Sequence, residues 1–370
     1  MKDRSTQNLK HEPVPLAIVG GGAAGMFAAA VAAERGVPCL LLERKARLGS
    51  KVLMTANGRC NFAKDIAPEQ FLADLSRGGI ASQCAEFAAE AVRECPPRRI
   101  VRGFQSLGVR TKRMNDGRVF PADEKAATIV HAFGDLLRDE EVPIATNCPV
   151  AAIERIEDGP ARLRVVTRNF SVEAENVLLA TGGASYPKTG SVGDGQRFAQ
   201  ALGHSVVPFR PGLIGVETND PRVIRLAGRR FEDGRARVLG AGGRVLFEHR
   251  GEVDCERFGL SGAAVYNAQR FIEHYMREAG ASEAPTLEVA FERNVVECRN
   301  PRPRPLKESI VTIGGVDLSE VDPRTMQSRL VPGLYFAGEV LDIDGPTGGY
   351  NLTLAFATAR KAVASVGVHC

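Results

Sequence analysis

Residues 16–43 constrain the fold of this chain more than any other stretch of its sequence. An apolar run comes first, and the pattern G-x-G-x-x-G follows it at Gly20, Gly22 and Gly25. An alanine-rich segment without proline comes next, and then a second apolar run that ends at Glu43. This order of strand, tight turn, helix and strand is typical of the βαβ unit that binds a dinucleotide.

Each part of this unit has a mechanical role. Gly20 makes the tight turn, Gly22 lets the backbone approach the pyrophosphate, and Gly25 lets the helix pack on the strand. The helix that follows directs free N–H groups and the positive end of its dipole at the phosphates. Glu43 is placed to accept hydrogen bonds from a ribose diol, and its charge would repel a 2′-phosphate.

The composition is that of an ordinary globular protein. The chain has 370 residues, of which 44% are hydrophobic and 25% charged, and its length favours one large domain plus a smaller one. The net charge of +4 is small for this length, so no nucleic-acid partner is expected. The first twelve residues lack the apolar core of a signal peptide, and no apolar run is long enough to span a membrane. Eight cysteines without a C-x-x-C pair or zinc spacing predict no metal site and a cytoplasmic protein.

Three further stretches look like parts of the same site. Residues 48–61 form a polar loop that ends in Gly-Arg-Cys-Asn and could wrap the far end of a long cofactor. Residues 176–195 place an apolar strand before Thr181, Gly182 and Gly183, and glycines there let a loop lie against a ligand. Residues 334–351 place Gly338 and Glu339 after another short strand.

The last of these stretches leads into a helix expected over residues 350–366. Gly348 and Gly349 stand at its start, where a surface helix would favour serine or aspartate. We therefore expect the first amides of this helix to face a flavin ring. We expect Gly349→Val to lose the cofactor or to lower the flavin potential markedly, while the fold survives. The acidic turn before the helix, with Asp342 and Asp344, is equally consistent with a hydrated turn.

The predicted fold is α/β: a Rossmann-like cofactor-binding domain of the glutathione-reductase type with an inserted antiparallel β-rich cap. We expect the discontinuous main domain over residues 13–204 and 306–370, the cap over residues 205–305, and a flexible tail over residues 1–12. Six arginines lie between Arg222 and Arg237, and they favour a solvated strand face over an anion site by about three to one.

The order of these motifs resembles one family closely. GGGAAG with a distant glutamate, GRCN, ATGG with GDG, and GLYFAGE with TGGYN are similar to the BaiN-like flavoproteins, the aminoacetone oxidase family of two-dinucleotide-binding-type FAD enzymes. The resemblance implies non-covalent FAD between the first glycine turn and the C-terminal helix. It also indicates that the helical subdomain which members carry in the cap is missing here. The candidate FAD-binding residues are Gly20, Gly22, Ala23, Ala24, Gly25, Glu43, Arg44, Lys51, Arg59, Cys60, Asn61, Val150, Thr181, Gly182, Gly183, Gly338, Glu339, Asp344, Gly348, Gly349, Tyr350 and Asn351.

The expected activity is hydride transfer between a small organic substrate and flavin N5. Because no second glycine-rich βαβ unit is present, the sequence favours a flavin reduced by its substrate and reoxidised by dioxygen or another acceptor. NAD(P)H as co-substrate of an enone-type reductase stays open, as do a tRNA-modifying flavoprotein and a non-catalytic FAD-binding protein. The sequence assigns no catalytic residue, since Tyr186, His249 and Tyr350 are each more consistent with a structural role. The substrate and the oligomeric state are also left open.

Overall fold

The computed structural model describes residues 13–157, 162–280 and 284–367. Its larger part is built on a seven-stranded sheet with the order β6-β2-β1-β9-β8-β7, in which β19 also pairs with β9. The strands are β1 (Val14–Val19), β2 (Cys39–Leu42), β6 (Ile144–Ala145), β7 (Val150–Arg155), β8 (Leu163–Thr167), β9 (Ser171–Leu179) and β19 (Leu334–Phe336). The strands β6, β2, β1, β9 and β19 run parallel, whereas β7 to β9 form an antiparallel meander.

Strand β9 joins the two halves of this sheet. Its first half pairs with β8, and its last residues, from Val177, pair with β19. Its other edge pairs with β1 over residues 174–179, and Leu16 to Val19 of β1 are at most 4% exposed. The sequence of a strand that is buried on both faces is a continuous apolar run, which explains the unbroken hydrophobic sequence of β1.

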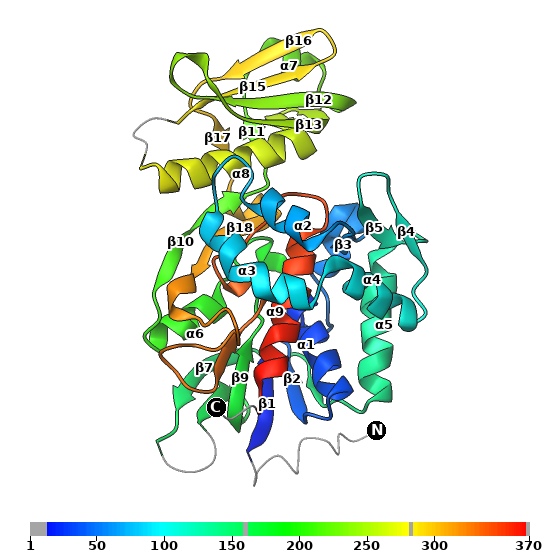
Figure 1. Cartoon of the computed structure of the whole chain (residues 1–370), viewed down its shortest axis with the longest axis vertical. Helices are drawn as coiled ribbons and strands as arrows, with labels where there is room; N and C mark the ends of the chain where they lie inside the picture. The colour runs from blue at the N-terminus through cyan, green and yellow to red at the C-terminus, as the bar shows by residue number, and fades with distance from the viewer. Residues whose placement is uncertain (1–12, 158–161, 281–283, 368–370) are drawn as a thin grey trace.

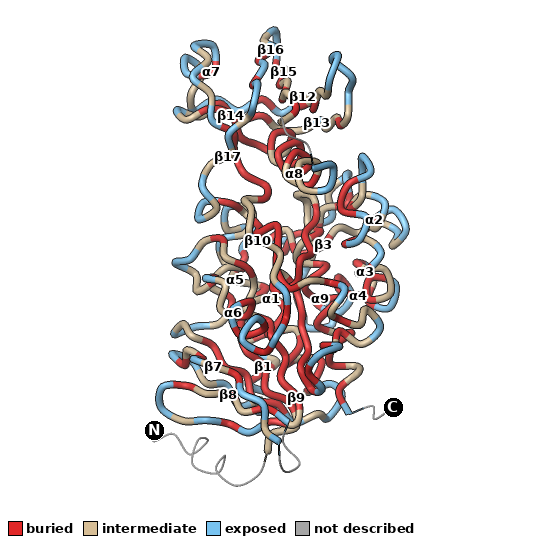
Figure 2. Tube along the Cα trace, turned by 90° about the vertical axis from the view of Figure 1, so that its left-hand side faces the viewer, coloured by how far each residue is buried: buried red, intermediate tan, exposed pale blue. Residues whose placement is uncertain are grey.

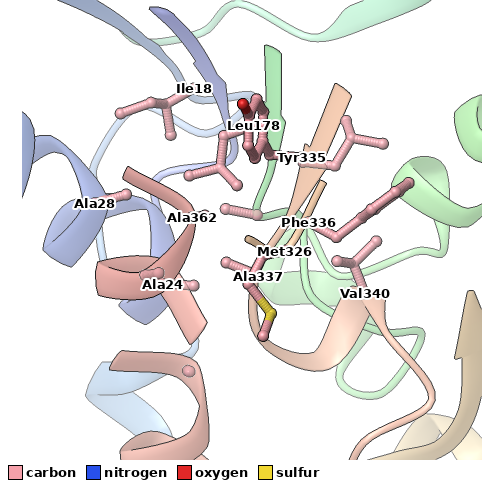
Figure 3. Close-up of a cluster of buried hydrophobic side chains, with 14 of the residues drawn as sticks. Ile18, Ala24, Ala28, Leu178, Met326, Tyr335, Phe336, Ala337, Val340 and Ala362 are labelled. Atoms are coloured by element: carbon pink, nitrogen blue, oxygen red, sulfur yellow. The ribbon is translucent and has the colours of Figure 1, made fainter. Parts of the chain in front are cut away.

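Two long helices pack against each other on the parallel strands: α1 (Ala23–Glu34) and α9 (Tyr350–Ser365). Small side chains such as Ala28 and Ala362 let them approach closely, and Ile18 and Leu178 lie under them (Figure 3). The other α-helices of this part are α2 (Pro68–Leu75), α3 (Ser82–Glu94), α4 (Pro97–Ser106), α5 (Ala126–Asp139) and α6 (Asp194–Ala201). Their buried aromatic side chains, among them Phe104, Phe133 and Phe356, form one contiguous core with the sheet.

The smaller part is an antiparallel sheet with the strand order β16-β15-β12-β13-β14-β11-β17 (Figure 1). Its strands are β11 (Val216–Glu217), β12 (Arg230–Leu239), β13 (Val245–Glu256), β14 (Gly259–Ser261), β15 (Thr286–Phe291), β16 (Asn294–Cys298) and β17 (Arg302–Pro303). Helix α8 (Ala263–Glu278) packs on this sheet and faces the larger part, and a short helix α7 (Pro221–Arg225) lies at the far side. We call this part the cap.

One short ladder connects the cap to the larger part, and one small sheet lies within the larger part. Strands β10 (Val206–Gly212) and β18 (Val311–Val316) pair antiparallel where the chain enters and leaves the cap. A three-stranded sheet of β3 (Ala63–Lys64), β5 (Arg118–Pro121) and β4 (Thr111–Arg113) lies on the other side, next to α2 (Figure 1). Figure 2 shows buried chain running continuously through the sheet and α9, and exposed chain mostly on the outer loops.

The predicted fold class is confirmed, because a Rossmann-type parallel sheet and antiparallel sheets are both present. One detail differs, because the sequence predicts a helix over residues 261–276 with Ser261 as its N-cap candidate. In the structure α8 begins at Ala263 after Gly262, whose φ is +95°, and Ser261 is the last residue of β14. The described part of residues 205–305 contains two α-helices, α7 and α8, and only a short connection leads from α8 to β15. The tail predicted over residues 1–12 lies outside the described residues. None of the helices described here is long and apolar enough to cross a bilayer.

Candidate functional site

The glycine turn between β1 and α1 is fixed by contacts that leave no room for side chains. At Gly20 the φ is +107°, and a Cβ there would lie 2.6 Å from the carbonyl oxygen of Ala180. At Gly25 a Cβ would lie 1.8 Å from the carbonyl oxygen of Gly20, so the helix packs directly on the turn. A Cβ at Gly22 would meet no atom within 4 Å, and Gly22 lines a large cavity. Its bare backbone is therefore free to face a ligand.

Glu43 stands at the end of β2 beside this turn and is 8% exposed. Its two carboxylate oxygens accept hydrogen bonds from the backbone N–H groups of Gly21 and Lys45, both at 2.7 Å. The carboxylate thus holds the turn in place and also lines the cavity. Next to it, Arg44 donates to Asp194 at 2.7 Å, which ties α6 to the same end of the site.

The cavity extends from this turn to the start of α9. Of the residues predicted from the sequence, thirteen line it: Gly20, Gly22, Ala23, Ala24, Glu43, Arg44, Lys51, Val150, Thr181, Gly182, Gly338, Glu339 and Asn351. The sequence analysis missed several others, including Ser50, Thr55, Cys148, Ser191, Asp194, Ile310, Val311, Ile343 and Leu352. Ser50, Thr55, Ser191, Asp194 and Ile343 lie within stretches that the sequence had marked as parts of the site, whereas no sequence signal marked Cys148, Ile310, Val311 or Leu352.

Glu339 is the second carboxylate of the cavity. One of its oxygens accepts from the N–H of Thr312 at 2.7 Å, and the other pairs with the Lys51 ammonium at 2.6 Å. Lys51 also donates to the hydroxyl of Ser185 at 2.7 Å. The contact between Lys51 and Glu339 joins the polar loop after β2 to the segment after β19, two stretches far apart in the sequence.

Nine of the predicted residues do not line the cavity: Gly25, Arg59, Cys60, Asn61, Gly183, Asp344, Gly348, Gly349 and Tyr350. Gly183 packs instead against Thr312, whose hydroxyl would lie 2.4 Å from an added Cβ. Arg59 is exposed, and its guanidinium lies 5.5 Å from the ring centre of Phe120. The Cys60 thiol is fully buried, and burial raises its pKa to about 12, so it is a core residue and not a reactive group.

Gly349 needs its missing side chain for a reason other than the one expected. Its φ is +97°, and an added Cβ would lie 2.5 Å from the backbone carbonyl of Ala63 and 2.9 Å from the side-chain oxygen of Asn61. The turn before α9 is thus packed on β3. The expectation that Gly349→Val leaves the fold intact is therefore wrong, because the added side chain meets the protein's own backbone.

The structure places Asp344 in contact with the cap and not in the cavity. It is 1% exposed and accepts from Arg270 at 2.5 Å and pairs with His274 at 2.8 Å, both from α8 of the cap. Burial would raise the pKa of Asp344, but Arg270 and His274 outweigh burial and hold it well below its usual range. Arg277, one turn further along α8, pairs with Asp342 at 2.9 Å. These two aspartates join the cap to the larger part, and Asp344 does not line the cavity.

The residues present fit a long dinucleotide cofactor. The cavity has a glycine turn and a carboxylate near one end, and Glu339 and the start of α9 near the other. The buried hydroxyl of Thr181, which lines this cavity, has no hydrogen-bond partner among the described residues. Buried polar atoms are rarely left unpaired, so this hydroxyl is consistent with a hydrogen-bond partner supplied by a ligand.

A second cavity, the interdomain cleft, lies between the cap and the turn before α9. Its lining includes Lys64, Asp74, Arg77 and Arg118 from the larger part, Phe247, His249 and Asn267 from the cap, and Thr347, Gly348 and Tyr350 from the turn. The Tyr350 hydroxyl donates to Asp74 at 2.5 Å, and the Asn267 side chain accepts from the Thr347 N–H at 3.0 Å. Two residues that the sequence left as uncertain candidates, His249 and Tyr350, thus share one cleft.

His249 is held neutral in this cleft. Burial lowers its pKa to about 4, and the nearby charges of Arg77 and Lys64 act in the same direction. Its Nε2 lies 3.0 Å from the Asn267 side-chain amide, and its ring is parallel to that of Phe247. Phe247 in turn stacks on Phe271 with ring centres 4.8 Å apart. These parallel rings line the cap side of the cleft, and we call them the aromatic wall.

Comparison with known proteins finds relatives that match this chain over nearly its whole length. The chain is 29% identical to the 3-dehydro-bile acid delta(4,6)-reductase of Clostridium scindens, over 94% of this chain and 97% of that protein. It is 27% identical to the ribosomal RNA dihydrouridine synthase of Escherichia coli K12, over 92% of this chain and 95% of that protein.

The fold also resembles a solved structure, the 3-ketosteroid-delta4-(5alpha)-dehydrogenase of Rhodococcus jostii RHA1 in complex with 4-androstene-3,17-dione. The TM-score is 0.56 with 14% sequence identity, and the match covers 99% of both chains. The family model described as the HI0933-like protein Rossmann domain matches residues 14–365, nearly the whole described chain. The chain therefore belongs to the HI0933-like family of Rossmann-type, FAD-dependent oxidoreductases.

Proposed function

We propose that this protein reduces a carbon–carbon double bond conjugated to a carbonyl group, and that the substrate binds in the interdomain cleft. The choice of the interdomain cleft as the substrate site rests on one observation. The segment over residues 346–352 borders both cavities, because Asn351 and Leu352 line the large cavity whereas Gly348 and Tyr350 line the cleft. A substrate in the cleft would lie beside the end of the cofactor cavity that α9 closes.

The large cavity would hold FAD along its length. The glycine turn and Glu43 would bind the ADP half, and Glu339 would accept hydrogen bonds from the ribityl hydroxyls. FAD, when bound, supplies a carrier of two electrons that exchanges hydride with a substrate carbon. The first turn of α9 would stabilise negative charge at the ring, since a helix N-terminus offers free N–H groups and a positive dipole end.

The direction of the reaction is proposed from the relatives. The names of the bile acid reductase and the dihydrouridine synthase have the addition of hydrogen to a ring double bond in common. The aromatic wall of Phe247 and His249 suits a flat ring, and offset stacking against such a ring is favourable. We accordingly favour NADH or NADPH as the electron donor over the substrate-reduced, dioxygen-coupled flavin that the sequence favoured.

Anaerobic half-reactions test this proposal. The holoprotein is mixed with NADH or NADPH, and flavin bleaching is followed by absorbance. The reduced protein is then mixed with 2-cyclohexenone, 3-oxo-4-cholenoate, uridine or dioxygen. We expect bleaching by a nicotinamide and reoxidation by at least one of the three conjugated compounds faster than in buffer alone. Bleaching by amines or amino acids, with reoxidation by dioxygen alone, would contradict the proposal.

A further inference from the structure

Tyr350 and Asp74 form a linked pair in the interdomain cleft. Tyr350 is the first residue of α9, and its hydroxyl donates to one Asp74 oxygen at 2.5 Å. Gln70, one turn earlier on α2, donates to the other oxygen at 2.9 Å. The Tyr350 ring is packed against Phe71 with ring centres 4.9 Å apart, so the hydroxyl is held in one position.

Burial and charge keep the Tyr350 hydroxyl protonated. The side chain is 4% exposed, and burial raises the pKa of its phenol strongly, with the carboxylate of Asp74 acting in the same direction. Asp74 itself is only half-buried and lines the cleft. The pair therefore connects an enclosed proton donor at the end of α9 to a carboxylate within reach of water.

We infer that Tyr350 is the proton donor of the reaction in this cleft, and that the Asp74 carboxylate holds its hydroxyl in position. This inference rests on the proposed function. A conjugated double bond that gains a hydride, one hydrogen with two electrons, at its β-carbon becomes an enolate. The O–H bond of Tyr350 breaks as its proton forms the new C–H bond at the α-carbon, and water in the cleft then returns a proton to the phenol oxygen and leaves as hydroxide.

The chemistry suits a phenol with a raised pKa. An enolate is a stronger base than a phenolate, so transfer from Tyr350 to the α-carbon is still downhill. His249 is a poorer candidate because it is neutral and its Nε2 faces Asn267. Lys64 lies with its ammonium 5.8 Å from the centre of the Tyr350 ring and would stabilise negative charge that develops there.

Tyr350→Phe tests the inference because it removes one oxygen and keeps the ring on Phe71. The first readout needs no turnover: 4-nitrophenolate, an anionic mimic of the enolate, is titrated into the oxidised holoprotein and followed by its absorbance. We expect the dissociation constant to rise about tenfold or more in Tyr350→Phe, as for a lost hydrogen bond to a charged group. Tyr275→Phe is the matched control, since Tyr275 stacks on Phe271 on α8 and does not line the cleft.

The second readout separates the two half-reactions. We expect Tyr350→Phe to slow reoxidation by the conjugated substrate by about 10²-fold or more, with flavin reduction by the nicotinamide unchanged. Asp74→Asn keeps a hydrogen-bond acceptor and removes the charge, so it should strengthen 4-nitrophenolate binding but hold the Tyr350 hydroxyl less firmly and slow steady-state turnover.

The outcomes distinguish this inference from the proposed function. If no conjugated compound reoxidises the wild-type flavin, the proposed function fails, and 4-nitrophenolate still reports whether Tyr350 donates into the cleft. Failure of the wild type to bind 4-nitrophenolate, or equal binding by wild type and Tyr350→Phe, overturns the inference. Equal slowing of both half-reactions in Tyr350→Phe would overturn it too, because a loss of structure affects both.

Discussion

Glu43 shows at the scale of one residue how a carboxylate prepares a binding site. Both of its oxygens already accept backbone N–H groups, and those bonds hold the glycine turn against β2. A ribose diol would therefore meet an acceptor whose position is fixed before binding. Preorganisation of this kind reduces the entropy lost on binding.

Glu43→Gln should weaken FAD binding by about 1.5–3 kcal/mol, because it removes the charge and replaces one acceptor oxygen with a donor that faces an N–H group. The dissociation constant is measured by the quenching of flavin fluorescence on reconstitution. Glu86→Gln on the exposed side of α3 is the control and should bind like the wild type. Unchanged affinity in Glu43→Gln would mean that Glu43 does not contact the cofactor.

Gly349→Ala should destabilise the apoprotein by at least about 1–3 kcal/mol, the cost of a non-glycine residue in a strained backbone region. The added methyl group also meets the Ala63 carbonyl. Urea unfolding of the apoprotein gives the value, with Gly103→Ala on α4 as control, where a Cβ meets no atom within 4 Å. An apoprotein of wild-type stability that has lost only its FAD would favour a ring-facing role for Gly349 instead.

Residues whose role depends on the local backbone conformation were predictable from the sequence. Gly20 and Gly25 follow from the geometry of a βαβ turn, and the structure gives each the close contact that the pattern demands. Asp344 was not predictable, because its partners on α8 lie about seventy residues away and come together only when the cap docks. The hydrogen bond from Tyr350 to Asp74 also joins distant segments, and no local pattern marks it.

Helix α8 is the element that joins the cap to the larger part. Arg270, His274 and Arg277 follow one face at helical spacing, and they pair with Asp344 and Asp342 on the segment that leads to α9. Burial alone would lower the pKa of His274, but Asp344 and Glu278 outweigh burial, so the net shift is upward. His274 therefore keeps its proton to a higher pH than a free histidine does, although it is 1% exposed.

The upward shift makes stability depend on pH in one direction. A folded pKa above the unfolded value of about 6.5 adds stability that is complete below pH 6.5 and is lost as the pH rises through the folded pKa. The pKa values of His249 and His204 are lowered in the folded protein. These two residues therefore change the unfolding free energy mainly below pH 6.5, where they reduce stability as the pH falls. The unfolding free energy should therefore fall from about pH 6.5 upward.

Urea unfolding at several pH values from about 6.5 to 8.5 measures this slope. His274→Gln should be less stable at every pH, since Asp344 loses a buried partner, and its slope over this range should be much flatter. Arg244→Gln on the cap surface is the control and should keep the wild-type slope. A wild-type slope in His274→Gln would show that another group titrates.

Helices and strands were easier to predict than their docking. The alanine-rich, proline-free composition of α1 and the apolar runs of β1 and β2 are local properties, and the structure has these three elements in the predicted order. The start of α8 was misplaced because Ser261 is a good cap by composition, whereas the chain needs it as the last residue of β14. Pairing in the sheet overrode the local preference of the helix end.

At the scale of the whole molecule, two cavities meet at one turn. The large cavity runs from the glycine turn after β1 to the start of α9, and the cleft lies between that start and the cap. The ion pairs of α8 hold the cap over this junction. In the proposed function each cavity has a separate task, cofactor binding in one and substrate binding in the other, and the two meet at residues 346–352.

The most direct test of this account is FAD binding by Gly22→Ala. A Cβ at Gly22 meets no protein atom, so the apoprotein should unfold within about 0.5 kcal/mol of the wild type. The same methyl group stands in the cavity where the pyrophosphate should lie, so the dissociation constant for FAD should rise about tenfold or more. Gly103→Ala should leave FAD affinity unchanged. Wild-type FAD affinity in Gly22→Ala would contradict the assignment of this cavity to the cofactor.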